Sequence, residues 1–191
     1  MPSGVWVRVP LRPLCSGEGN WYTCHTQNMA FVGSTPTQNT MIILDRDGLL
    51  NVNSKDINSP YYYILRKEDL LLKPKVKEAM EFFKGKRVVL ATRQKCISKG
   101  LVSEEQVKEI NDYLCELLGF TFEKIYVQIE GDDKTETFQK IIDEYGTDLL
   151  LIDDSEKECM AARKLGITAI CTEDLYTELR QMLVRCVSLE N

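Results

Sequence analysis

The sequence contains one histidine among 191 residues, and this scarcity restricts the chemistry open to it. That residue, His25, lies in an N-terminal stretch with no sustained helical or strand period. Acid/base steps in the folded part must then use carboxylate, lysine, tyrosine or cysteine side chains. Serine and cysteine triads that depend on histidine are excluded if His25 lies outside the core.

Several other familiar features are missing. Neither GxxxxGK[ST] nor GxGxxG occurs, so nucleotide binding by those loops is unsupported. The 7 cysteines are irregularly spaced and include no CxxC pair, which predicts reduced, mostly buried thiols and a cytoplasmic location. No apolar run could span a bilayer, and the first residues lack the apolar core of a signal peptide, so we expect no membrane partner. The net charge of -5 is mixed along the chain, without the basic stripe that duplex nucleic acid attracts.

The length predicts one α/β domain with its own core. Residues 1–40 are rich in proline, glycine and small polar residues, and we interpret them as a poorly ordered extension. Weak pairing of Val5 to Val9 at a sheet edge is the alternative. Because the first convincing strand begins at Met41, we hypothesise that translation naturally starts there, that residues 1–40 are not native or are dispensable, and that the domain is 41–191.

The segment from Met41 to Asn51 is the centre of the predicted site. Its apolar first half does not alternate, which is typical of a strand buried on both faces of a parallel sheet. Asp45 and Asp47 follow at the carboxyl end of this strand, and Gly48 permits a sharp exit. Two carboxylates this close repel each other, and a divalent cation would offset the repulsion. A turn capped by an aspartate is the alternative; a calcium loop is disfavoured because apolar residues occupy its later ligand positions.

The remainder of the chain alternates between strands and helices. The predicted strands cover residues 41–45, 87–91, 123–128, 149–152 and 167–171, the third with alternation around Ile125 and Val127. The predicted helices run from Pro74 to Gly85, from a capping box at Ser103 and Gln106 to Leu118, from Lys134 onward, from Ser155 to Leu165, and along Leu175, Leu179 and Leu183. The inward face of the second of these helices is predicted to be Val107, Ile110, Leu114 and Leu117. This alternation predicts a parallel sheet with helices on both faces, a three-layer α/β/α fold.

A Tyr-rich connection links the first strand to the first helix. Tyr61, Tyr62 and Tyr63 stand in a polar stretch from Asn51 to Lys73. These rings either stack on a substrate ring or base or, as we prefer, pack the loop onto the sheet.

Polar residues at the strand ends should meet in one crevice, because parallel strands point the same way. The candidates are Asp45, Asp47, Thr92, Lys134, Asp153 and Asp154. Carboxylate oxygens suit Mg²⁺, and Lys134 with backbone NH groups after Thr92 would hold phosphate oxygens. Without histidine, Asp45 is the natural nucleophile, forming an aspartyl-phosphate, while Asp47 protonates the leaving oxygen and then activates water.

These motifs resemble those of the haloacid dehalogenase (HAD) superfamily phosphatases, over residues 41 to about 183. Asp45-Arg-Asp47-Gly is similar to the first HAD motif in its DRDG form, Thr92 with Arg93-Gln94 to the second, Lys134 to the third, and Asp153-Asp154 with Glu158 to the fourth. The resemblance implies a HAD-like Rossmannoid fold and Mg²⁺-dependent phosphoryl transfer. It also implies phosphate binding by Thr92, Arg93 and Lys134, and metal binding by Asp45, the Asp47 carbonyl and Asp154, with Asp153 as a further candidate.

Within the superfamily, the DRDG form and residues 92–100 resemble the heptose bisphosphate and histidinol phosphate phosphatases. Their zinc loop has no counterpart between Tyr126 and Asp133, so we expect no zinc. No insertion is long enough for a cap domain, which predicts a capless, open site. We expect a small phosphorylated metabolite as substrate.

Two alternatives stay open. Residues 100–127 also resemble the phosphatase half of polynucleotide kinase-phosphatases, and Lys95 and Lys99 could meet the phosphates of a DNA or RNA 3′ end. The second is a catalytically inactive binding module of the same fold. None of the expected acids, nor the lysine, is missing, which favours the enzyme.

Overall fold

The computed structural model describes residues 39–53 and 63–188, with side chains described up to Met182. Backbone contacts divide the chain into two units, 1–33 and 34–191, and the second contains every described residue. The predicted extension therefore lies outside the described residues, apart from Asn39 and Thr40. Tyr61 and Tyr62 lie outside them as well, whereas Tyr63 packs half-buried against the apolar cluster of Cys96, Val102 and Val107, in line with the packing interpretation.

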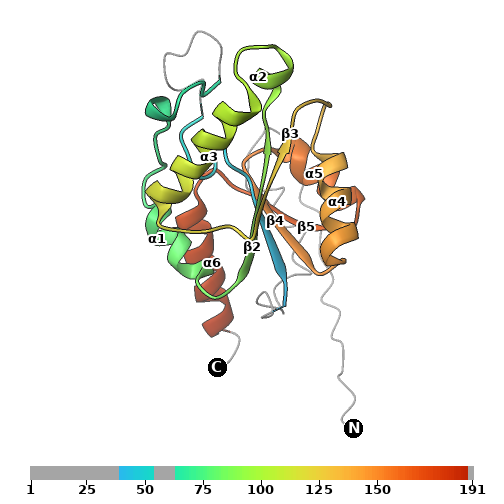
Figure 1. The fold of residues 1–191 in the computed structure, drawn as a ribbon. Helices are drawn as coiled ribbons and strands as arrows, with labels where there is room; N and C mark the ends of the chain where they lie inside the picture. Colours follow the sequence, from blue (N-terminus) through green and yellow to red (C-terminus); the bar gives the residue numbers. More distant parts are fainter. Residues whose placement is uncertain (1–38, 54–62, 189–191) are drawn as a thin grey trace, which may run out of the picture. The chain divides into compact units, whose positions relative to one another are not determined.

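Five parallel strands form one sheet, as predicted (Figure 1). They are β1 (Met41–Leu44), β2 (Arg87–Arg93), β3 (Lys124–Gln128), β4 (Leu149–Asp153) and β5 (Thr168–Cys171). The strand order is β3-β2-β1-β4-β5, so β1 is central and β3 and β5 are the edges. All four residues of β1 are buried, because a central strand contacts helices on both faces of the sheet.

Side chains that alternate along the strands build two separate cores. Ile42 and Leu44 belong to one apolar cluster, together with residues of the helices α1 (Val76–Met80), α3 (Glu104–Leu118) and α6 (Leu175–Ser188). Met41 and Ile43 belong to the other, with residues of α4 (Thr135–Tyr145) and α5 (Glu156–Lys164). Figure 1 shows α1, α3 and α6 on one side of the sheet and α4 and α5 on the other. The predicted three-layer α/β/α architecture is therefore confirmed.

Six α-helices lie in the described residues. They are α1 (Val76–Met80), α2 (Lys95–Ser98), α3 (Glu104–Leu118), α4 (Thr135–Tyr145), α5 (Glu156–Lys164) and α6 (Leu175–Ser188). The predicted capping box starts α3: Ser103 Oγ accepts from the Gln106 backbone NH, and Gln106 Oε1 accepts from the Ser103 NH. Gly119, at φ 61°, ends the same helix in the left-handed conformation that glycine favours.

The structure differs from the sequence prediction in four details. The helix expected from Pro74 contains only α1 followed by a 3-10 turn, Glu81–Phe83, and α2 was not predicted. Leu118 is buried at the end of α3, whereas Leu117 is only partly buried. Alternation in β3 places Tyr126 inside but leaves Val127 38% exposed, because its side chain points to the opposite face of an edge strand.

Four cysteines with described side chains are free thiols, two of them buried and two half-buried. They are Cys96, Cys115, Cys159 and Cys171. None of the helices in the described part of the chain combines the length and apolar character needed to cross a membrane.

Candidate active site

The candidate site lies where the strand order reverses. The chain passes from β1 outward to β2 and β3, then returns to the other side of β1 with β4 and β5. Loops that follow β1 and β4 therefore diverge and leave a crevice at the carboxyl ends of these neighbouring strands. Asp45 directly follows β1, and Asp153 is the last residue of β4.

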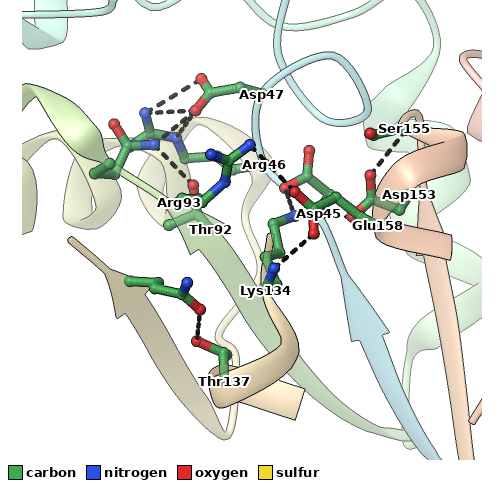
Figure 2. A network of polar contacts seen from close by, with 12 residues as sticks. Asp45, Arg46, Asp47, Thr92, Arg93, Lys134, Thr137, Asp153, Ser155 and Glu158 are labelled. Atoms are coloured by element: carbon green, nitrogen blue, oxygen red, sulfur yellow. Dashed lines mark hydrogen bonds and ion pairs between the residues drawn. The ribbon is translucent and has the colours of Figure 1, made fainter. Parts of the chain in front are cut away.

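Three carboxylates and one ammonium group meet in this crevice. Asp45, Asp153 and Asp154 each offer a carboxylate oxygen within 4.8 Å of the other two. Lys134, at the start of α4, extends its ammonium group between two of them, donating to Asp45 Oδ1 and, at 2.8 Å, to Asp153 Oδ2 (Figure 2). The predicted convergence of the first, third and fourth motifs is therefore present.

This cluster carries more negative than positive charge. Burial raises the pKa of Asp45 well above its ordinary value; Lys134 opposes this shift, and the neighbouring carboxylates add to it. Burial and the charge of Asp153 raise the pKa of Asp154 to about 6. Burial alone would lower the pKa of Lys134, but the Asp45 and Asp153 carboxylates outweigh burial and raise it. One ammonium group does not compensate three carboxylates, and an added cation would favour their ionised forms.

The donor set and the backbone around it fit a small divalent cation. Hard carboxylate oxygens at this spacing are the ligands that Mg²⁺ prefers. Gly48 makes the close approach of Asp154 possible, because a Cβ at position 48 would lie 2.0 Å from Asp154 Oδ2. The φ of Gly48 is 97°, in the region that glycine tolerates best. Asp45 and Asp154 are thus held close enough to share one ion.

The Asp47 carboxylate is held by other partners. Its two oxygens accept hydrogen bonds from Arg46, from Asn51 Nδ2 at 3.0 Å and from Gln94 Nε2 at 2.7 Å. Burial tends to raise the pKa of Asp47, but Arg46 and these hydrogen bonds outweigh it and bring the pKa below its ordinary value. These contacts hold the carboxylate in a fixed direction and favour its ionised form.

The second motif contributes Thr92 and Arg93 at the end of β2. The Thr92 hydroxyl accepts from Gln94 Nε2 at 2.8 Å, which connects it to the Asp47 network. Arg93 pairs with Glu158 of α5 at 3.2 Å, and its buried Nε has no hydrogen-bond partner among the described residues. Glu158 also accepts from the Lys134 backbone NH at 2.7 Å, so it fixes residues of the second and third motifs together.

Sequence reasoning missed the roles of Arg46 and Asn111. Arg46 is fully buried, and its Nη1 donates to Asn111 Oδ1 of α3 at 2.8 Å. A signal for Asn111 was present: it lies four residues after Val107 and one after Ile110, on the apolar face of the helix. A polar residue at such a position requires a buried partner.

Comparison with known proteins gives a curated relative, and no protein-family model matches the chain. The relative is the D-glycero-D-manno-heptose-1,7-bisphosphate 7-phosphatase of Chlorobaculum tepidum, 38% identical over 80 residues. The aligned part covers 41% of this chain and only 37% of the relative.

Solved structures resemble a larger share of the chain. The D,D-heptose 1,7-bisphosphate phosphatase of B. bronchiseptica, complexed with magnesium and phosphate, has a TM-score of 0.59 and 23% identity, covering 68% of this chain and 78% of its own. A protein of Mesorhizobium loti described as HAD-like phosphatase has a TM-score of 0.61 and 18% identity, covering 78% and 87%. The Pnkp1/Rnl/Hen1 RNA repair complex has a TM-score of 0.52 and 17% identity, covering 74% of this chain and 45% of that one.

The likenesses to solved structures concern the fold, whereas the curated relative adds sequence identity over part of the chain. The chain has the fold of the HAD phosphatases, and over 80 residues it is similar in sequence to one heptose bisphosphate phosphatase.

Proposed function

We propose that this protein is a Mg²⁺-dependent phosphomonoester hydrolase that acts through an aspartyl-phosphate on a small phosphorylated metabolite of the sugar phosphate type. The observation that carries the proposal is the grouping of Asp45, Asp153 and Asp154 around one crevice with the Lys134 ammonium beside them. The sugar phosphate class is supported by the 38% identity to the heptose bisphosphate phosphatase, over the aligned part alone.

The metal would be held by Asp45 and Asp154, with Asp153 and the Asp47 carbonyl as further ligands. A divalent cation in this position neutralises charge on the carboxylates and on an entering phosphate group. The ammonium group of Lys134 supplies a second, permanent positive charge, and its contacts with Asp45 and Asp153 fix its place. Together they would allow two anions, a carboxylate and a phosphate ester, to approach.

Two chemical steps follow from these positions. In the first, an Asp45 oxygen attacks phosphorus and the bond to the leaving oxygen breaks. The leaving oxygen receives its proton through Asp47, which, being ionised in the free protein, first takes it from the entering phosphate monoanion or from water. In the second, Asp47 accepts a proton from water, and the water oxygen attacks the aspartyl-phosphate to release inorganic phosphate and regenerate Asp45. The lowered pKa of Asp47 favours its ionised state, which suits the second step.

Phosphate oxygens would be held by Thr92, Arg93 and Lys134. The Arg93 side chain is 27% exposed, so an entering ligand can reach it while Glu158 holds it in place.

The proposal is tested with p-nitrophenyl phosphate and Mg²⁺, comparing the wild type with Asp45→Asn. We expect hydrolysis by the wild type and a loss of at least about 1,000-fold in the variant, since it lacks the nucleophile. A wild type that is inert with several metals and substrates would favour the binding module instead.

A polynucleotide 3′-phosphatase is the second candidate. It is favoured by two lysines that follow the end of β2, Lys95 at the start of α2 and Lys99 at its C-cap. A panel of sugar phosphates, nucleoside monophosphates and a 3′-phosphorylated oligonucleotide separates the two: preference for the oligonucleotide would replace the sugar phosphate proposal.

A further inference from the structure

A fully buried arginine lies between the two catalytic aspartates in the sequence. Arg46 is 0% exposed and is the largest of the fully buried side chains. A buried guanidinium is stable only where its charge is paired and its NH groups are bonded. The residues that bond to Arg46 therefore indicate its role.

One side of the Arg46 guanidinium is bound to Asp47. Its Nη2 donates to Asp47 Oδ2 at 2.9 Å and Oδ1 at 3.2 Å, and its Nε donates to Oδ2 at 3.2 Å. Such multiple contacts fix the plane of the carboxylate as well as its position. Figure 2 shows the polar contacts around Asp47.

The other side of the guanidinium is anchored by α3. Arg46 Nη1 donates to Asn111 Oδ1 at 2.8 Å, across 65 residues of sequence, and Asn111 is only 2% exposed. Without this acceptor, the hydrogen bonds of the guanidinium to described residues would be those with Asp47 alone, and an arginine side chain has several rotatable bonds. Asn111 therefore restricts the orientation in which Arg46 holds the carboxylate.

We propose that Asn111, acting through Arg46, is a positioning residue that holds the Asp47 carboxylate in the direction required for proton transfer to the leaving oxygen. This inference rests on the proposed phosphatase function. It makes α3, which contributes no group to the metal cluster, part of the acid/base machinery. A purely structural role for the Arg46–Asn111 contact would change stability and leave proton transfer unaffected.

The test compares two substrates that differ in their need for a proton. An alkyl phosphate has a poor leaving group that requires protonation, whereas p-nitrophenolate leaves without it. In Asn111→Leu, which keeps the branched shape but lacks the acceptor, we expect kcat/KM for the alkyl phosphate to fall about tenfold and that for p-nitrophenyl phosphate by less than about twofold. Asn111→Asp retains an acceptor at the same place and should restore most of the loss.

Ile110→Val is the matched control, because Ile110 is a buried neighbour on the same helix that belongs to the apolar core. It should lower stability without changing the ratio of the two kcat/KM values. An equal fall for both substrates in Asn111→Leu, or no fall for either, would overturn the inference while the wild-type activity upholds the phosphatase proposal. If the leucine variant does not fold, Asn111→Ala replaces it.

A second measurement does not depend on activity. In the wild type, the Nε–H of Arg46 is hydrogen-bonded and buried, so its NMR signal should exchange slowly with water. We expect faster exchange in Asn111→Leu and unchanged exchange in Ile110→Val. Slow exchange that persists in Asn111→Leu would refute the positioning role even if the wild type proved inert as a phosphatase.

Discussion

Replacing Gly48 with alanine is expected to disable the cation site while leaving the fold intact. The added Cβ would lie 2.0 Å from Asp154 Oδ2 and 2.5 Å from its Cγ, whereas ordinary contact begins at 3.4 Å. Asp154 must therefore move by about 1.4 Å, since the backbone of this turn is packed between buried elements. Mg²⁺ requires near-ideal ligand geometry, so we expect its affinity to fall by at least about 100-fold.

Backbone strain is a separate effect of the same substitution. A φ of 97° costs a residue with a Cβ about 1–2 kcal/mol, which in a chain of this size lowers the melting temperature by about 2–8 °C. Gly166→Ala is the matched control, because Gly166 has a φ of 83° and a Cβ added there would meet no atom of the described residues within 4 Å. It should reproduce the strain and leave Mg²⁺ binding unchanged.

The assay is calorimetric titration of Mg²⁺ into each folded variant, followed by phosphatase measurements over a range of Mg²⁺ concentrations. Gly48→Ala should bind weakly and need far more Mg²⁺ for any activity, in contrast to Gly166→Ala. Wild-type affinity in Gly48→Ala would show that Asp154 is not a ligand, and would refute the proposed metal geometry.

Three further predictions concern other contacts. Lys134→Met should lower the free energy of unfolding by about 3 kcal/mol in metal-free protein, because it leaves buried carboxylates unpaired. Chemical denaturation with and without Mg²⁺ should show that the cation restores part of the lost stability. A variant as stable as the wild type would contradict the charge argument. Glu158→Gln should weaken inhibition by inorganic phosphate about tenfold by releasing Arg93 and the Lys134 backbone, whereas Glu156→Gln on the same helix should not. Ser103→Ala should lower the free energy of unfolding by about 1 kcal/mol, because α3 loses its N-terminal cap, while full activity is retained. A lower kcat would contradict this and would connect the cap to the site.

The sequence by itself determined the order of elements and the end of the sheet where the site forms. Short apolar runs such as Met41–Leu44 predict buried strands, and the alternation of strands with amphipathic helices permits few arrangements other than a parallel sheet. Asp45 and Asp153 follow such runs, so their meeting at one edge of the sheet was predictable. The capping box at Ser103 was equally predictable, because its two hydrogen bonds join residues three apart.

Only the tertiary structure decided how the polar side chains divide into two groups. Asp45 and Asp47 are two residues apart, yet Asp45 joins Lys134 and the acids of β4, whereas Asp47 binds Arg46, Asn51 and Gln94. Beyond the end of a strand, no regular period governs the direction of side chains, so their partners depend on which loops pack nearby.

The contact of Arg46 with Asn111 and that of Glu158 with Arg93 were also beyond the sequence. Each joins residues 65 positions apart, on elements whose separation is fixed by the packing of helices against the sheet. Local patterns specify which faces are buried, but the pairing of buried polar groups follows only once α3 and α5 are docked.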